Sequence, residues 1–321
     1  LSIPIFIVAM LLLAIIGQLV TRENPSDSLE KLKIEYSKPH QTGIDHSKLS
    51  ALQVDFETPQ AVTKACASCH TERSEELLKS SHWNWERESY IPGRGVVNAG
   101  KKNLINNFCI SIGSNEQSCN SCHAGFGWSD ASFDFKKKEN IDCLICHDNS
   151  GQYFKAKGGA GYPDDETNLQ LAAQSVALPT KDNCGLCHFY SGGGNNVKHG
   201  DLEEAILTAD RNVDVHMGFD GGNLECVTCH EAENHRMLGK LYSVSSMNKN
   251  RMRCEKCHGD VPHSENILNE HTIKVACQTC HIPEYAKVNA TKMYWDWSQA
   301  GRLKNGKPFE EKDADGNVTY F

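Results

Sequence analysis

The pattern Cys-x-x-Cys-His recurs seven times along this chain of 321 residues and uses all but one of its 15 cysteines. Within each copy the two thiols lie about one helical turn apart, which lets both form thioethers with the two vinyl groups of one porphyrin. The histidine that follows can then bind the iron from the proximal side. The pattern therefore predicts seven covalently attached c-type haems.

The predicted attachment residues are thioether-forming cysteines and iron-binding histidines. The cysteines are Cys66, Cys69, Cys119, Cys122, Cys143, Cys146, Cys184, Cys187, Cys226, Cys229, Cys254, Cys257, Cys277 and Cys280. The proximal histidines are His70, His123, His147, His188, His230, His258 and His281. Structural zinc would use cysteine pairs in sets of two or a downstream histidine pair, and a disulfide scaffold would need no histidines. Neither alternative explains a histidine directly after every second cysteine.

The density of motifs limits the fold. Without its first twenty residues the chain has 301 residues for seven motifs, about 43 per haem, so the porphyrins themselves would form most of the core. The steps from motif to motif are 53, 24, 41, 42, 28 and 23 residues, which excludes a solenoid of equal repeats. We expect a mainly α chain with extensive coil, a multihaem cytochrome c wrapped around a closely packed haem array, with short helices near 72–79, 202–208 and 268–276.

The first twenty residues are uncharged, almost wholly apolar and long enough to cross a bilayer. We interpret them as an uncleaved signal anchor forming an N-terminal transmembrane helix; the alternative is a cleaved signal peptide, for which no small-x-small site is evident. The expected organisation is an anchor over 1–20, a polar linker over 21–60, a seven-haem domain over 61–285, and the start of a truncated C-terminal region over 286–321. Because haem is attached covalently outside the cytoplasmic membrane, the body is expected on the periplasmic or extracellular side, anchored there or secreted after cleavage.

Charge and cofactor content indicate the kinds of partner. The formal net charge of −8 argues against nucleic acid. A chain of haems indicates a redox partner, such as another cytochrome or a quinol dehydrogenase, and the apolar segment indicates the membrane. The sequence does not determine the oligomeric state.

Histidines outside the motifs are candidates for the second axial position. Electron carriers usually fill the sixth position of a haem iron with a second histidine, and seven irons would use nearly all of the eight histidines that remain. The candidate distal ligands are His46, His82, His199, His216, His235, His263 and His271, with His40 as the spare. The sequence does not assign any of them to a particular haem.

The segment before the second motif has a different composition. It contains two adjacent lysines, Lys101 and Lys102, and the cysteine that no motif uses, Cys109. Taken alone, these residues favour a basic loop with a buried thiol. A lysine amine can nevertheless bind haem iron when burial and the metal lower its pKa. Such a ligand would leave more readily than imidazole and would open that iron to substrate.

Longer strings around the motifs carry a more specific pattern: Gly100–Ile110 with Cys119–Trp128, then Asp142–Asp148, Asn183–Gly194 and Val197–Leu202. In these strings the chain resembles the octahaem tetrathionate reductase family of multihaem cytochromes c, and the resemblance covers most of residues 60–300. The family has eight haems, so an eighth haem is expected downstream of the seven motifs found here.

The resemblance implies a function and a catalytic site. In that family the second haem has a lysine as distal ligand and is catalytic, while the other haems are bis-histidine. Carried over, the second haem is the one on Cys119, Cys122 and His123, with Lys101 the better candidate ligand and Lys102 the fallback. Cys109 would line the pocket.

The implied reaction is reduction of tetrathionate, nitrite or hydroxylamine, by a chain that attracts a small anionic substrate through the remaining lysine and Arg94. The alternative is a periplasmic or extracellular electron-transfer conduit without catalysis.

Overall fold

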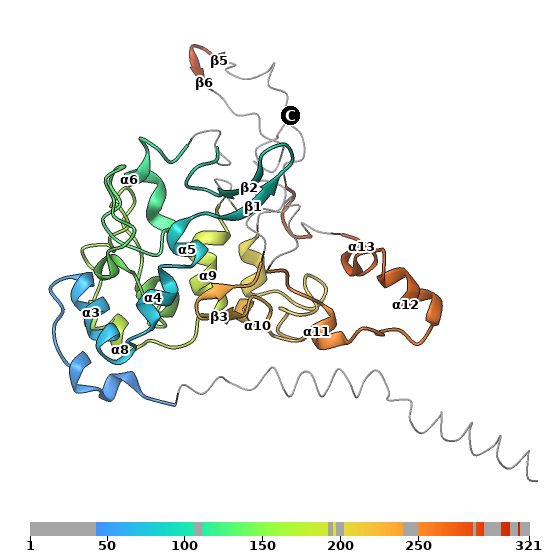
Figure 1. Ribbon diagram of the computed structural model, residues 1–321, viewed down its shortest axis with the longest axis horizontal. Coiled ribbons are helices and arrows are strands. Elements are labelled where there is room, and N and C mark those ends of the chain that lie inside the picture. Colours follow the sequence, from blue (N-terminus) through green and yellow to red (C-terminus); the bar gives the residue numbers. More distant parts are fainter. Residues whose placement is uncertain are drawn as a thin grey trace, which may run out of the picture.

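The computed structural model describes residues 43–105, 111–191, 195–196, 202–239, 250–284, 287–291, 303–308 and 314 (Figure 1). These residues form short helices joined by extensive coil, as expected. The proposed anchor, the residues up to 42 of the proposed linker, Cys109, His40 and His199 lie outside the described residues. Within the ranges given above, no helix is both long and apolar enough to cross a membrane.

The helices and strands follow one another along the chain in short elements. The α-helices are α3 (Pro59–Cys69), α4 (Arg73–Leu77), α5 (Ser81–Asn84), α6 (Glu116–Cys119), α7 (Leu144–His147), α8 (Leu169–Gln174), α9 (Lys181–His188), α10 (Cys226–Cys229), α11 (Glu255–His258), α12 (Asn266–Thr272) and α13 (Cys277–His281). The 3-10 helices are η1 (His46–Lys48), η2 (Ser50–Leu52), η3 (Asn120–Cys122), η4 (Lys138–Asn140) and η5 (Glu204–Leu207). Three antiparallel hairpins pair β1 (Arg87–Ile91) with β2 (Gly95–Ala99), β3 (Ala232–Glu233) with β4 (Arg236–Met237), and β5 (Leu303–Lys304) with β6 (Lys307–Pro308).

The three helices expected from sequence are found with altered bounds. Helix α4 lies inside 72–79, and the segment expected near 202–208 forms only the 3-10 helix η5. Helix α12 ends at Thr272, before the expected end at Ala276, because Ala276 is extended and begins the next motif helix.

Local sequence explains where the longer helices begin. At the start of α3, the Thr58 hydroxyl accepts a hydrogen bond from the Ala61 N–H at 3.2 Å, and Pro59 occupies the first turn. Helix α9 begins with a capping box, in which Asn183 accepts from the Thr180 N–H at 2.8 Å. Both helices end in a motif, so these caps fix the direction in which the motif is presented.

Two clusters of apolar side chains form the protein core. The first joins Leu52 and Phe56 to Val62 of α3, Leu144 of α7 and the α8 alanines. The part of the chain around Leu52 and Phe56 therefore packs against the folded body. The second cluster consists of Trp85, Ile112 and Trp128, and the cysteines of the second motif pack against it.

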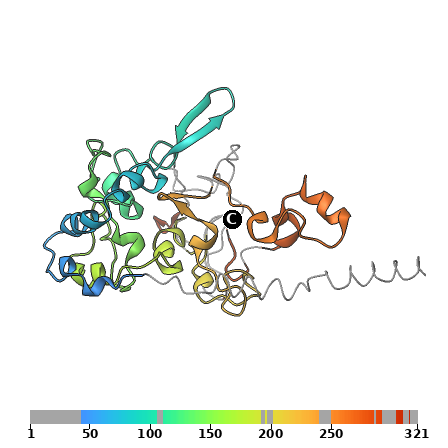
Figure 2. The same cartoon turned by 60° about the horizontal axis from the view of Figure 1, so that its bottom comes forward.

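The hairpin β1–β2 projects from the body and ends beside the candidate lysines (Figure 2). Its strands are in register from Arg87 opposite Ala99 to Ile91 opposite Gly95. At its base, a Cβ on Gly100 would lie 2.2 Å from the Trp85 carbonyl oxygen. Only glycine lets the backbone pass this close, so Gly100 fixes how Lys101 and Lys102 enter the body.

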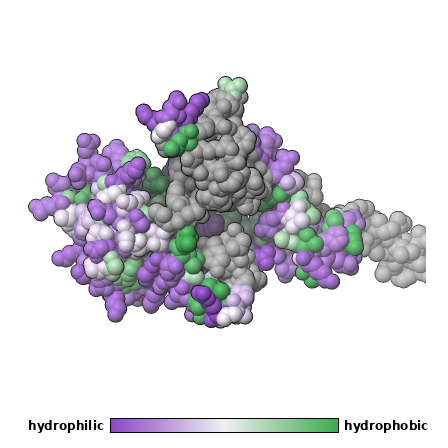
Figure 3. Space-filling model, turned by 90° about the horizontal axis from the view of Figure 1, so that it is seen from above, coloured by the Kyte–Doolittle hydropathy of each residue, from purple (hydrophilic) through white to green (hydrophobic). Residues whose placement is uncertain are grey.

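The apolar core is uneven along the chain. Among the described residues, Ala209 is the single buried hydrophobic residue beyond Phe189. Helices α11, α12 and α13 form a part that extends away from α3 and α8 (Figure 1). Among the described residues on the face drawn in Figure 3, hydrophilic side chains predominate, with small scattered hydrophobic groups. The C-terminal part thus has little side-chain core of its own, which agrees with the expectation that porphyrins supply it.

Candidate functional site

Every Cys-x-x-Cys-His motif lies in or directly at the end of a helical element. The motif elements are α3, α6 with η3, α7, α9, α10, α11 and α13. Because these are single helical turns at the motif, each pair of thiols is presented on one side with the histidine beside it. This is the local arrangement that attachment of one porphyrin per motif requires.

Five proximal histidines face a second imidazole. The ring centroids are 6.3 Å apart for His46 and His70, 6.4 Å for His82 and His188, 6.5 Å for His147 and His235, 6.1 Å for His216 and His258, and 5.8 Å for His263 and His281. In each pair one residue belongs to a motif and the other is a distal candidate. The fold thus supplies the pairing that the sequence leaves open.

The separation within these pairs fits an iron between the rings. Imidazole nitrogens bind metals at about 2.0 Å, and each ring centroid lies about 1.2 Å beyond its nitrogen. Two imidazoles on opposite sides of one metal would therefore have centroids about 6.4 Å apart. The five observed values, 5.8 to 6.5 Å, bracket this separation. The residues present therefore fit bis-histidine haem.

Hydrogen bonds hold two of the motif histidines by Nδ1. His147 Nδ1 lies 2.9 Å from the Ala177 carbonyl oxygen, and His230 Nδ1 lies 2.9 Å from that of Leu238. This leaves Nε2 for a metal. Burial lowers the pKa of His82 to about 4 and also lowers the pKa of His147. Both imidazoles are therefore neutral at pH 7, the form that binds iron.

Cysteines of different motifs lie next to one another. Hydrogen-bonding contacts join Cys66 to Cys143, Cys122 to Cys187, Cys184 to Cys226 and Cys254 to Cys277. The thiol of Cys146 in the third motif contributes to the raised pKa of Cys187 in the fourth, and those of Cys257 and Cys254 in the sixth contribute to the raised pKa of Cys229 in the fifth. The cysteines of the seven motifs therefore form one connected set of close neighbours, and those of the fourth motif, on α9, contact the second and the fifth motifs.

The second motif has different surroundings. His123 is fully buried (0% exposed) and faces no second histidine among the described residues. Its Nε2 lies 2.7 Å from the Trp83 carbonyl oxygen, and burial lowers its pKa to about 3. Five aromatic rings enclose it with centroids 5.0 to 6.0 Å away: Trp83, Trp85, Trp128, Phe133 and Phe135.

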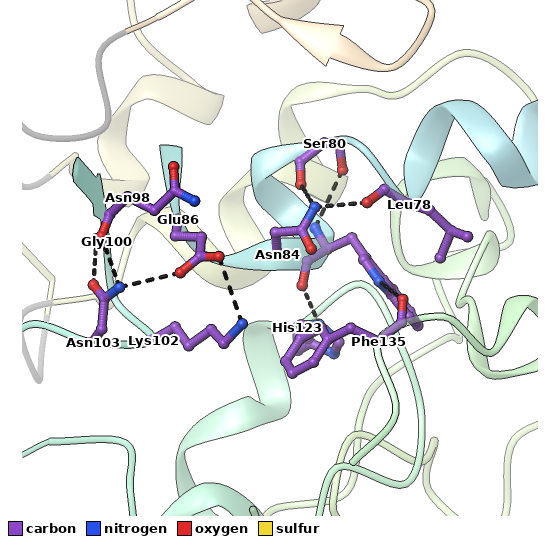
Figure 4. Close-up of polar contacts among 11 residues, drawn as sticks. Leu78, Ser80, Asn84, Glu86, Asn98, Gly100, Lys102, Asn103, His123 and Phe135 are labelled. Atoms are coloured by element: carbon purple, nitrogen blue, oxygen red, sulfur yellow. Dashed lines mark hydrogen bonds and ion pairs between the residues drawn. The ribbon is translucent and has the colours of Figure 1, made fainter. Parts of the chain in front are cut away.

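The two candidate lysines differ in what they contact. Lys101 Nζ lies 4.3 Å from the centroid of the Trp85 ring, and its charge lowers the pKa of His123. Lys102 Nζ lies 3.7 Å from a carboxylate oxygen of Glu86 and 4.2 Å from the Phe135 ring centroid (Figure 4). Lys102 is thus paired, whereas no carboxylate of the described chain pairs with Lys101.

Asn103 fixes the backbone that carries both lysines. Its side-chain amide donates to Glu86 at 3.1 Å and to the Asn98 carbonyl at 2.9 Å, and its oxygen accepts from the Gly100 N–H at 2.9 Å (Figure 4). These bonds close the base of the β1–β2 hairpin. They hold Lys101 on the side of Trp85 and Lys102 on the side of Glu86.

A buried ion pair connects the second motif to the third. Lys155 Nζ lies 3.0 Å from Asp142 Oδ2, with the two side chains only 2% and 0% exposed. The same ammonium donates to the carbonyls of His123 and Gly125. Asp142 also accepts from the Ile145 N–H at 3.1 Å, at the start of α7.

Some predicted site residues have no imidazole partner in the described part of the chain or lie outside it. His271 lies on α12 and faces no imidazole within the described ranges. His230 likewise faces none there, while its remaining candidate partner, His199, and Cys109 lie outside those ranges. The aromatic enclosure of His123 and the ion pair of Lys155 were not predicted. The cluster Trp83-Asn84-Trp85 next to candidate ligand His82 was the available signal for the enclosure.

Comparison with known proteins points to the same cofactor. The structure is similar to the crystal structure of octaheme cytochrome c from Shewanella oneidensis, with a TM-score of 0.74 and 47% sequence identity. The match covers 87% of this chain and 61% of that chain, so this chain spans about three fifths of the solved protein. The likeness supports a multihaem c-type cytochrome. Haem c is therefore the cofactor for which the motifs are built.

Two further comparisons add little about function. An uncharacterized protein from Archaeoglobus fulgidus is 24% identical over 240 residues, which is 60% of this chain and 80% of that protein. No protein family model matches the sequence.

Proposed function

We propose that this protein is a multihaem c-type oxidoreductase that reduces tetrathionate, a small nitrogen oxyanion such as nitrite, or hydroxylamine at its second haem. The observation that supports this is the contrast among proximal histidines. Five face a second imidazole at 5.8 to 6.5 Å, which suits electron transfer. His123 instead lies inside an aromatic enclosure beside Lys101, which suits chemistry.

The proposed holder of the second haem is the group Cys119, Cys122 and His123, with Lys101 as distal ligand. When bound, haem supplies an iron that exchanges single electrons and keeps one axial position for a ligand weaker than imidazole. For this, His123 gives up its hydrogen bond to the Trp83 carbonyl. Lys101 gives up its proton, since only the neutral amine binds a metal.

The contacts of the two lysines support Lys101 over Lys102. The Glu86 carboxylate pairs with Lys102 and holds its amine away from a ligand role. Lys102, proposed to help attract an anionic substrate, has its charge partly offset by Glu86, and the charge of the buried Lys155 is offset by Asp142. Arg94, which was also predicted to attract the anionic substrate, lies in the turn at the outer end of the β1–β2 hairpin.

The remaining haems are proposed to supply electrons. In each of the five imidazole pairs, the histidine outside the motif is the proposed distal ligand. His199 is the proposed distal ligand of the iron bound by His230. His271 is proposed for the iron of an eighth haem. The linked motif cysteines support a continuous route that reaches the second motif through the fourth. The proposed donor is a cytochrome or quinol dehydrogenase, on the periplasmic or outer side of a cytoplasmic membrane to which residues 1–20 attach the protein.

Substitution of the two lysines tests the ligand. In the full-length holoprotein, Lys101→Ala should abolish a lysine-ligated or high-spin signal in EPR and resonance Raman spectra and lower turnover at least tenfold. Lys102→Ala is the matched control, with the same charge loss one residue away, and should keep that signal. The reverse result would assign Lys102.

Activity toward tetrathionate, nitrite and hydroxylamine, measured with reduced viologen in one preparation, identifies the substrate. Wild-type protein should reduce at least one of them. If all haems are low-spin bis-histidine and none of the three is reduced, the protein is an electron-transfer conduit and the enzyme proposal is wrong.

A further inference from the structure

A carboxylate contacts the Nδ1 atom of one of the candidate distal histidines. His235 Nδ1 is 2.9 Å from Glu76 Oε2, although the two residues are far apart in the sequence. His235 faces His147 of the third motif at 6.5 Å. Glu76, on α4, is only 14% exposed. The proton on His235 Nδ1 is therefore shared with a largely buried carboxylate on the side opposite the metal position.

This arrangement differs from the other imidazole pairs. Among the described residues, no other histidine of the five pairs has a carboxylate oxygen within 4.0 Å of a ring nitrogen. The buried Nδ1 atoms of His46 and His263 have no hydrogen-bond partner in the described chain. The third motif is thus the place where a negative charge acts directly on an axial ligand.

The backbone is built to bring His235 to Glu76. Asn234 and His235 form the two-residue turn between β3 and β4, with φ of 51° and 58°. Positive φ at both positions is typical of a tight hairpin turn, and Asn and His are among the non-glycine residues that adopt it most readily. Arg87 holds the end of this hairpin through the carbonyls of Met237 and Gly239, at 3.1 and 2.7 Å.

We propose that Glu76 is a positioning residue that lowers the reduction potential of the third haem. By accepting the Nδ1 proton of His235, the carboxylate makes the imidazole a stronger donor and stabilises ferric iron. Arg73 opposes it, because its guanidinium binds both Glu76 oxygens at 2.7 and 2.8 Å and withdraws negative charge. The inference rests on haem ligation by His147 and His235, and not on chemistry at the second haem.

Removing the negative charge of Glu76 and removing the positive charge of Arg73 should shift the reduction potential of the third haem in opposite directions. Glu76→Gln should raise the ferrous-to-ferric ratio of the third haem at fixed potential at least tenfold, which is an upward shift of 59 mV. Arg73→Gln should lower that ratio by a smaller factor, because Arg73 is 56% exposed. Glu75→Gln is the matched control: it removes the same charge from the same helix, but Glu75 pairs with Lys138.

The measurement is an EPR-monitored redox titration of the full-length holoprotein. The third haem is identified as the low-spin signal that His235→Ala converts to high spin. A shift in Glu76→Gln that is absent in Glu75→Gln supports the inference. An unchanged midpoint in Glu76→Gln, or no high-spin conversion in His235→Ala, overturns it. Neither outcome touches the proposed activity, which is read from the lysine variants.

Discussion

At the scale of single residues, the buried charges carry the largest energetic consequences. Lys155 and Asp142 are almost wholly enclosed, and each has other polar partners: backbone carbonyls for the ammonium and the start of α7 for the carboxylate. Removing one member of a buried pair leaves an uncompensated charge, while removing both is often nearly neutral. The pair therefore fixes the backbone of His123 against the third motif.

Lys155→Met or Asp142→Asn alone should lower the free energy of unfolding by about 3–5 kcal/mol. The double variant should lose much less than the sum of the two, because no buried charge is then left unpaired. Chemical denaturation of the four proteins, followed by near-UV circular dichroism, gives this coupling. Additive losses would mean that the two side chains act independently.

At the scale of elements, α9 connects several motifs. It contacts α7, η3 and η5, and its cysteines touch those of the second and fifth motifs. The distal candidate for its iron, His82, lies on α5 and directly precedes Trp83 of the enclosure around His123. Electrons held on the other haems would therefore reach the second haem through the fourth.

His82→Met should trap electrons at the fourth haem, because methionine ligation raises the potential of a haem iron. Stopped-flow mixing of fully reduced protein with the substrate should show rapid oxidation of the second haem. The remaining haems should then be oxidised at least tenfold more slowly than in the wild type. His263→Met, at the seventh motif, is the control and should delay only its own haem. Equal slowing in both variants would contradict a junction at α9.

At the scale of the whole molecule, the two ends depend on the cofactor to different degrees. Both apolar clusters are built from residues between Leu52 and Ala173. Beyond Phe189, Ala209 is the single buried hydrophobic residue in the described part of the chain. A segment that buries so little apolar surface cannot offset the entropy of ordering its backbone without the porphyrins.

Removal of the seventh haem by Cys277→Ala with Cys280→Ala should expose 250–284 to protease while 43–191 stays protected. Limited proteolysis with mass spectrometry of the fragments measures this. Cys66→Ala with Cys69→Ala removes one haem beside the first apolar cluster and serves as the control, with cleavage of 43–191 expected to stay slow. Equal protection of 250–284 in the wild type and in the seventh-haem variant would show that this segment folds without that haem.

Sequence alone predicted the attachment chemistry, because thioether formation and proximal ligation need residues at fixed short spacing. It also limited the distal ligands to a few histidines and drew attention to the lysines before the second motif. Short helices around the motifs and extensive coil followed from the same spacing. These are local properties, set within one or two helical turns.

Tertiary structure decided which distant residues meet. His82 faces His188 and His235 faces His147 only because separate segments fold together. The contrast between Lys101 and Lys102 depends on how Gly100 and Asn103 turn the backbone at the base of a hairpin. Glu76 behind His235 had no sequence signal, since a glutamate on a short helix is ordinarily a solvated side chain. Adjacency of this kind arises from packing, which spacing along the chain does not encode.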